Sequence, residues 1–332
     1  FESTAHYALN LELFLENAHH SFMEVNPVLI KEYKKSTTLR RTKTDSVDCE
    51  SIARWLITVE YKPHSKGFYH AYSLKSLTRL RDRLIRQRSF YLVKITNVLD
   101  HTFPEFKPFF NERLSKTALY LLENYGSAEK MARMNSASYD KLRCISRGKF
   151  SIQQFLRLKE LAANTVGVNN SIFDLELNTL LTLYKSLSDE INTLETEIIK
   201  LIEEVHPHYM SIPGIGPISS AVIYAEYGDI SNFSNPGQML AFAGIEPGIN
   251  DSGTESHGGR MVKHGSSQLR YVLLNACLPL IRFDLTFATY YEKKRAEGKK
   301  HRVAITHVAK KLIRVIYALE RQDVDFNAQK LR

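Results

Sequence analysis

Cysteine, tryptophan and long hydrophobic runs are scarce in this sequence. It contains one tryptophan and three cysteines, and Cys49, Cys144 and Cys277 lie far apart without the spacing of a metal site. This usage predicts reduced thiols in a cytoplasmic protein rather than a disulfide framework. The longest apolar run, Tyr271–Ile281, is too short and too interrupted to span a bilayer. The sequence therefore predicts no membrane span, and it contains no signal-peptide pattern.

Acidic residues are also sparse in one basic segment. The 332 residues carry a net charge of +9, yet residues 260–314 alone hold 13 Lys and Arg against 3 Asp and Glu. That segment accounts for the whole excess of positive charge. A solvated helical face usually interleaves both signs, and here the acids are missing. We therefore expect a polyanionic partner, most simply nucleic acid.

The length and a hydrophobic content of 43% allow two or three domains with real cores. Residues 1–65 alternate helical and strand patterns, with a strand at 21–25 closed by Asn26-Pro27, so they predict part of an α/β layer. Residues 66–206 are predicted to be nearly all helical, and residues 207–332 form a second functional module, also mostly helical. The predicted fold class is α/β plus α.

Hydrophobic residues recur in alternating steps of four and three near the end of the helical region. They are Phe173, Leu177, Leu180, Tyr184, Leu187, Ile191, Leu194, Ile198, Leu201 and Val205. This seam predicts a coiled coil that pairs with another helix, either in the same chain or in a dimer. A long helix of a bundle is the alternative.

Two carboxylates, Asp45 and Asp48, stand three residues apart behind a basic, hydroxyl-rich lead-in. In a helix that begins near Thr44 they share one face of the first turn. Glu2 precedes a predicted strand and is a candidate third carboxylate. Such a group in a basic protein is suited to Mg²⁺ held against a phosphate. Ordinary capping of a helix by first-turn acids is the alternative.

The segment Ile212-Pro213-Gly214-Ile215-Gly216-Pro217 leads into an apolar helix. A glycine-rich turn with proline at the first helical position leaves backbone N–H groups at the positive helix end. Gly214 and Gly216 thus resemble a helix–hairpin–helix turn that binds a DNA phosphate without reading bases. A plain interhelical turn is as good an interpretation.

Ser252 lies in a polar, glycine-flanked loop, and basic residues follow it at Arg260, Lys263 and Arg270. These cations are suited to neutralise charge on a phosphate attacked by the serine hydroxyl. A GxSxG elbow is missing, which argues against acyl chemistry. An inert loop serine is the alternative. Ser256, Ser266 and Ser267 compete for the role, although the last two have the pattern of helix N-caps.

Taken in order, these segments resemble the insertion-sequence transposases with a DEDD acidic tetrad, a family that includes the Piv-type DNA invertases. The resemblance runs over essentially the whole chain and is carried by several ordered motifs. They are Glu2, Asn26-Pro27, Lys43-Thr44-Asp45, Asp48, Ile52-Ala53, Gly214–Gly216, Phe242–Gly244, Ser252-Gly253, Gly265–Arg270 and the basic helix around Lys310-Lys311.

The resemblance implies an RNase H-like (RuvC-like) fold at 1–65, a helical coiled-coil region at 66–206 and a transposase domain at 207–332. It implies Mg²⁺ held by the tetrad, of which Glu2, Asp45 and Asp48 match the last three members. The first aspartate lies on the opening strand in that family, so we expect this chain to be truncated at its N-terminus. It also implies Ser252 as the covalent nucleophile on DNA, and an element-encoded, non-coding guide RNA as a partner.

We therefore expect a transposase, with Ser252, Glu2, Asp45 and Asp48 as catalytic residues. The expected nucleic-acid contacts are Gly214, Gly216, Arg260, Lys263, His264, Arg270, Lys310 and Lys311. Because two duplexes must be brought together, a homodimer or tetramer is expected. A metal-dependent junction nuclease without a covalent intermediate, and a non-catalytic nucleic-acid-binding remnant, are the two alternatives.

Overall fold

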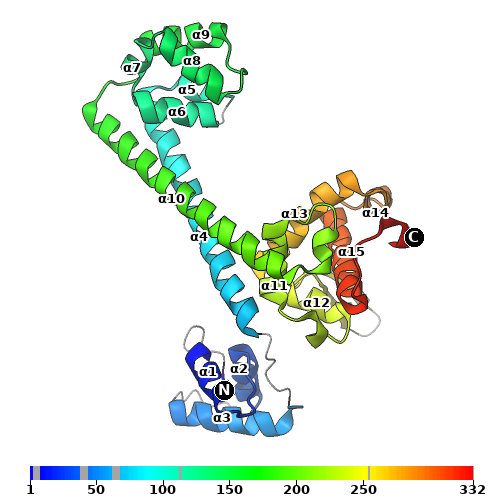
Figure 1. The fold of residues 1–332 in the computed structure, drawn as a ribbon. Coiled ribbons are helices and arrows are strands. Elements are labelled where there is room, and N and C mark those ends of the chain that lie inside the picture. The colour runs from blue at the N-terminus through cyan, green and yellow to red at the C-terminus, as the bar shows by residue number, and fades with distance from the viewer. Residues whose placement is uncertain (3–7, 38–43, 62–67, 112–113, 253–254, 332) are drawn as a thin grey trace. The chain divides into compact units, whose positions relative to one another are not determined.

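The computed structural model describes residues 1–2, 8–37, 44–61, 68–111, 114–252 and 255–331. Helices dominate it (Figure 1). The chain divides into two units, Phe1–Tyr69 and His70–Arg332.

The first unit contains three helices, α1 (Ala8–Asn17), α2 (Pro27–Thr37) and α3 (Asp45–Thr58). Its opening residues run beside the segment before α2. The Val25 amide donates to the Phe1 carbonyl at 2.9 Å, and Glu2 and Val25 form one parallel bridge. The ring of Phe1 stacks on Phe22, with 5.8 Å between centroids. Val25 is fully buried, so this contact anchors the start of the described chain.

The α/β fold predicted for residues 1–65 is wrong. The described residues of this unit contain no strand, and their only sheet-like pairing is the isolated bridge between Glu2 and Val25. The segment at 21–25 does not extend into a strand, because α2 begins at Pro27 and a proline has no amide to donate to a ladder. An RNase H-like sheet is therefore replaced here by a small helical unit.

The second unit begins in the long helix α4. Its helices are α4 (Phe68–Thr102), α5 (Phe106–Phe109), α6 (Lys116–Tyr125), α7 (Ala128–Ala132), α8 (Ser136–Ile145), α9 (Ile152–Ala163), α10 (Ser171–Val205), α11 (Pro217–Tyr227), α12 (Pro236–Phe242), α13 (Ser267–Phe283), α14 (Leu285–Ala296) and α15 (His301–Gln322), with 3-10 turns η2 (His208–Ser211), η3 (Ile230–Asn232) and η4 (Ala328–Leu331). Two strands, β1 (Pro247–Ser252) and β2 (Glu255–Met261), form an antiparallel hairpin.

The long helices α4 and α10 pack against each other within the chain (Figure 1). Leu74 near the start of α4 shares a buried cluster with Ile198 and Ile202, whereas Leu99 near its end shares one with Leu177. The two helices therefore run antiparallel. The Arg81 guanidinium spans them and donates to the Glu195 carboxylate at 2.8 Å. The apolar seam of α10 is thus covered by a helix of the same chain.

Short helices α5 to α9 pack against the C-terminal end of α4 and the N-terminal part of α10. Their buried side chains include Phe106, Leu121, Leu142 and Leu158, which pack with Leu99 and Phe103 of the α4 end. Serine or asparagine caps begin most of these short helices, and Ser151 and Gln154 form a reciprocal capping box at α9. Local capping therefore defines the helix ends while one shared cluster holds them together.

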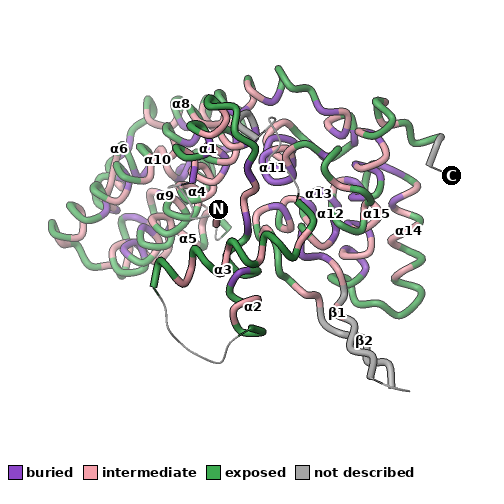
Figure 2. The backbone as a smooth tube through the Cα atoms, turned by 90° about the horizontal axis from the view of Figure 1, so that it is seen from below, coloured by how far each residue is buried: buried purple, intermediate pink, exposed green. Residues whose placement is uncertain are grey.

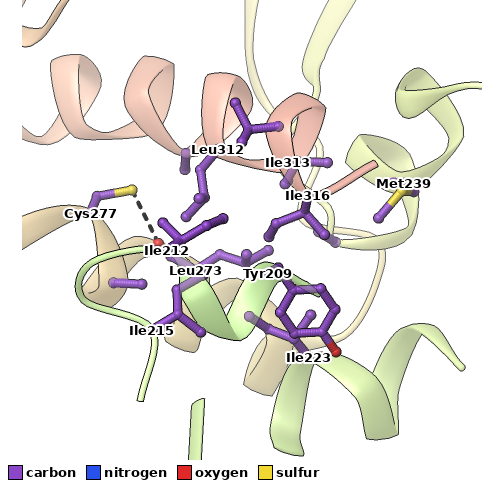
Figure 3. Packing of buried hydrophobic residues seen from close by; sticks show 14 of the residues in the cluster. Tyr209, Ile212, Ile215, Ile223, Met239, Leu273, Cys277, Leu312, Ile313 and Ile316 are labelled. Atoms are coloured by element: carbon purple, nitrogen blue, oxygen red, sulfur yellow. Dashed lines mark hydrogen bonds between the residues drawn. The ribbon is translucent and has the colours of Figure 1, made fainter. Parts of the chain in front are cut away.

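The largest hydrophobic cluster joins η2 and helices α11 to α15. Tyr209, Leu273, Leu312 and Ile316 meet at its centre (Figure 3). The Cys277 thiol lies inside it and donates to the Leu273 carbonyl at 3.1 Å, and burial raises its pKa to about 12. Helix α11 is buried along nearly all of its length (Figure 2). This cluster supports the C-terminal elements of the candidate site, among them α11, α13 and α15.

The segment after α15 folds back onto η2. Asp325 accepts from Nδ1 of His208 at 3.0 Å and Asp323 accepts from Nε2 at 2.9 Å, while Phe326 donates its amide to the Ser211 hydroxyl at 2.8 Å. Both ring nitrogens face carboxylates, so this geometry favours the doubly protonated imidazolium. Hydrogen bonds to Asp325 and Asp323 raise the pKa of His208, against a smaller opposing effect of burial.

Within the described residues, no single helix combines the length and the apolar composition needed to cross a membrane. Only α13 and α14 taken together pass that test, and they are bent by 106°. Much of α13 is buried in the C-terminal cluster.

Replacement of Arg79 tests the junction between α4 and α11. Arg79 forms two hydrogen bonds, of 2.9 and 3.1 Å, with the Glu226 carboxylate, whose side chain is only 2% exposed. Because Arg79→Ala leaves a buried charge without its main partner, we expect the free energy of unfolding to fall by about 2–3 kcal/mol. Arg86→Ala is the matched control on the same helix. It removes only an exposed pair with Asp82 and should cost less than about 1 kcal/mol in urea unfolding. Equal losses would contradict this account.

Replacement of His208 tests the folded-back segment by its pH dependence. A pKa raised above the ordinary 6.5 means that the folded state binds the proton more tightly than the unfolded state. The stabilisation is fully present below pH 6.5 and is lost as the pH rises through the raised pKa. Wild type and His208→Gln should therefore differ most in free energy of unfolding near pH 6, and progressively less towards pH 9. A difference independent of pH would contradict the ionic contact.

Candidate functional site

Asp45 and Asp48 lie in the first turn of α3, as the sequence predicts. Thr44 caps this helix, and its hydroxyl accepts the Val47 amide at 3.4 Å. The Asp48 carboxylate forms an ion pair with Lys34 of α2, and both side chains are one quarter exposed. The two carboxylates thus begin a helix whose position is fixed by a contact with α2.

The described residues do not bring three acids together. No group of three His, Cys, Asp or Glu among them is placed to hold a metal ion. Glu2 is held at its bridge with Val25, and the Lys34 ammonium already neutralises Asp48. Carboxylates are the ligand type that Mg²⁺ prefers, but this arrangement does not fit the ion. The roles of Glu2, Asp45 and Asp48 as metal ligands and catalytic residues stay predictions.

Ser252 is the last residue of β1 and pairs across the turn with Glu255. At the other end of the hairpin Pro247 pairs with Met261. A strand rises by about 3.3 Å per residue, so Ser252 stands about 17 Å from Pro247 along the hairpin. The backbone of Arg260 is therefore near the base while that of Ser252 is at the tip. The side chains of residues 249–260 lie outside what the structure describes.

Arg270 holds two loops together at the base of the hairpin. Its Nη1 atom donates to the carbonyls of Ala243 and Lys263, at 3.2 and 3.5 Å. The loops meet so closely at Gly265 that a β-carbon there would lie 2.2 Å from the Phe242 carbonyl oxygen. Lys263 and His264 remain exposed beside this contact. Arg270 thus braces the loop that presents them.

Ser266 is the N-cap of α13, because its hydroxyl accepts the Leu269 amide at 3.2 Å. The sequence proposed Ser266 and Ser267 as caps, and the structure confirms this for Ser266. Ser267 is instead the first residue of the helix.

Lys310 and Lys311 lie on α15 and are both partly buried. Burial lowers the pKa of each ammonium, and for Lys310 the neighbouring Arg314 adds to this effect. The Lys311 ammonium lies over two rings, 5.3 Å from the centroid of Phe287 and 5.2 Å from that of Tyr290. These lysines therefore pack along the helix surface, whereas Arg314 is exposed.

The sequence interpretation overlooked a second basic region in α4, where five arginines fall between residues 79 and 88. The density of arginines in this segment was the sequence signal that could have indicated a second basic surface. Three of them form ion pairs in the structure. Arg79 pairs with Glu226, Arg81 with Glu195, and Arg86 with Asp82. Arg83 is exposed and remains a candidate for phosphate contact.

The glycine turn places its two glycines in different surroundings. Gly214 has φ of +97°, and a β-carbon there would lie 2.8 Å from Cγ of Pro279 in α13. Gly216 is the N-cap of α11 at φ −81°, and a β-carbon on it would meet nothing within 4 Å. The first turn of α11 offers amides without helical acceptors, as any helix start does.

Alanine substitution separates the two glycines. We expect Gly214→Ala to lower the free energy of unfolding by about 1–3 kcal/mol, because it combines a left-handed backbone with a close contact. Gly216→Ala should change it by less than about 0.5 kcal/mol. Thermal unfolding of both variants checks this, and a comparable loss in Gly216→Ala would contradict the turn geometry.

The two regions that carry these residues match known families. Residues 207–292 match the model described as the transposase IS116/IS110/IS902 family, and residues 1–104 match a transposase model of the DEDD type from IS110. The first match contains the glycine turn, the hairpin and Arg270. The second contains Asp45, Asp48 and all of α4.

Three curated relatives are similar to the chain. The 43.6 kDa protein of insertion element IS110 from Streptomyces coelicolor is 27% identical over 71% of this chain and 60% of its own length. The transposase for insertion sequence element IS1111A from Coxiella burnetii is 25% identical over 78% and 59%. The pilin gene-inverting protein of Moraxella bovis is 27% identical over 42% and 46%. The alignments therefore span about 60% of the two insertion-element proteins. The chain is therefore similar to transposases over two regions: residues 207–292 match the IS116/IS110/IS902 family model, and residues 1–104 match the DEDD-type model.

Proposed function

We propose that this protein is a DNA transposase that cuts and rejoins DNA strands with the hydroxyl of Ser252. The observation that supports this most directly is the position of Ser252 at the tip of the β1–β2 hairpin, inside the segment that matches the transposase family. The end of a two-stranded hairpin is suited to approach a DNA strand. The inverting activity in the name of the Moraxella relative is consistent with strand exchange.

The chemistry is two successive exchanges at phosphorus. The Ser252 oxygen forms a bond to the phosphorus of the scissile phosphodiester, the bond to the leaving deoxyribose oxygen breaks, and that oxygen ends with the serine proton. A hydroxyl from the partner strand then attacks the phosphoserine and returns the proton to Ser252. The number of phosphodiester bonds is conserved, so no energy source is consumed.

The cations at the hairpin base serve to hold the DNA in this proposal. Lys263 and His264 are exposed there, and Arg270 fixes the loop on which they lie. With Arg260 they stand about a hairpin length from Ser252, so they are suited to flanking phosphates rather than to the scissile one. Binding should therefore weaken with rising salt as counterions are released.

The partners and the metal follow from the family relation. We propose DNA as substrate, an element-encoded guide RNA on the remaining basic surface, and at least a dimer to bring two duplexes together. The DEDD-type match over residues 1–104 supports use of a divalent metal. Glu2, Asp45 and Asp48 are the ligands that the sequence motifs predict for it, and when bound it would polarise the phosphate. Because their described arrangement does not fit the ion, no step above depends on it.

A second candidate function is nucleic-acid binding without catalysis. The pairing of Asp48 with Lys34 favours it, since a neutralised carboxylate is a poor metal ligand. In that case the chain binds DNA but forms no phosphoserine.

Replacement of Ser252 decides between these functions. Wild-type protein mixed with end-labelled DNA should yield a covalent protein–DNA adduct on a denaturing gel. Ser252→Ala should reduce the adduct to background because the nucleophile is lost, while its affinity for the DNA stays unchanged. Ser256→Ala on β2 is the matched control and should retain the adduct. An adduct that persists in Ser252→Ala contradicts the assignment, and its absence in wild type favours the binding-only function.

A further inference from the structure

A cavity of about 540 Å³ lies beside α15 in the C-terminal cluster. Tyr290 of α14 lines it from one direction, one face of α15 from another, and residues 324–327 complete the wall. This volume falls within the range of roughly 300–1,000 Å³ that is typical of small-ligand sites. No residue placed above in strand cleavage lines the cavity.

The inner wall of the cavity is apolar and fixed in position. Val315 and Leu319 are nearly fully buried on α15, and Val324 and Phe326 pack against the same hydrophobic cluster. The outer segment is held by the hydrogen bond from the Phe326 amide to Ser211 and by the contact of Asp325 with His208. The cavity is therefore formed before any ligand arrives, which limits the entropy cost of binding.

Positive charge is concentrated on one side of the cavity. Arg314 and Lys311 both line it, and Lys310 lies close enough to Arg314 for the arginine to lower the pKa of its ammonium. Among the described residues, no carboxylate lies within ion-pair distance of the exposed Arg314. This side is suited to an anion, and the guanidinium is suited to the two oxygens of a phosphate.

Polar side chains with hydrogen-bonding capacity line the remaining wall. Gln322 and Asn327 each contribute a side-chain amide, and Oδ1 of Asn327 already accepts from the backbone N–H of Gln329 at 2.9 Å. Asp325 adds a carboxylate with one oxygen engaged by His208. Amides and carboxylates are the groups that pair with the edges of nucleobases.

We propose that this cavity binds one unpaired DNA nucleotide. The base lies against Val315, Leu319 and Phe326, its edge meets Gln322 and Asn327, and its phosphate lies on Arg314 and Lys311. A paired base does not fit, because a pocket of this size admits a base only after it has left the stack. The inference rests on the proposed function, since strand exchange separates bases from their partners close to the cut.

Binding of two DNA duplexes to the full-length chain tests this. One duplex is fully paired and the other carries a single unpaired nucleotide, with affinities measured by fluorescence anisotropy. Wild type should prefer the unpaired duplex by roughly tenfold, the effect expected for one well-packed base. Ala318→Phe fills the cavity and should abolish the preference without weakening binding of the paired duplex. Ala296→Phe, at an exposed alanine of α14, is the matched control and should keep it.

Arg314→Gln provides a second test that leaves the core untouched. It should weaken binding of the unpaired duplex and lower the slope of log affinity against log salt by about one for that duplex. No preference in wild type, or an unchanged preference in both cavity variants, overturns the inference while leaving the proposed function intact. Failure of wild type to bind either duplex overturns both. A stronger preference when the unpaired position is a ribonucleotide overturns the assignment to DNA.

Discussion

The ion pair between the buried carboxylate of Glu226 and Arg79 is the contact on which the packing of α4 against α11 depends. The carboxylate lies near the end of α11, inside the packing between that helix and α4, and its charge is balanced by Arg79, with Lys75 at 3.9 Å. An ion of this kind is stable only where its partners stay in place. The apolar packing of Leu74 with Ile198 and Ala221 surrounds the same junction. The direction of the long helices relative to the site-bearing helices is thus set by one charge and the side chains around it.

Local sequence patterns predict the helices well and the long-range contacts poorly. The heptad seam predicts a helix over 173–205, and the structure has α10 at Ser171–Val205, with Leu177, Ile191 and Ile198 buried. Such patterns work because they are repeated many times within one element. The predicted sheet at 1–65 fails for the opposite reason. A strand exists only where a distant backbone pairs with it, and among the described residues of this unit that pairing is limited to Glu2 and Val25.

The candidate site shows the same division. Capping by Ser266, the helix that begins at Asp45 and the exposed Gly216 follow from a few neighbouring residues. The hydrogen bonds by which Arg270 joins two loops, and the burial of Lys310 and Lys311, depend on elements far away in the sequence. The folded-back segment that forms one wall of the cavity depends on His208, more than a hundred residues upstream of Asp325. No spacing rule connects residues at that separation.

The hairpin also has a mechanical consequence. Its base is joined to the helical cluster, where the Val262 amide donates to the Glu246 carbonyl at 3.1 Å and Arg270 braces the adjoining loops. A lever of this length amplifies small rotations at its pivot, since a tilt of about 10° displaces a tip about 17 Å away by roughly 3 Å. Misplacement of a reacting group by about 1 Å is enough to slow a reaction severely. In the proposed mechanism, the stiffness of this base therefore limits how accurately Ser252 is positioned at the phosphate.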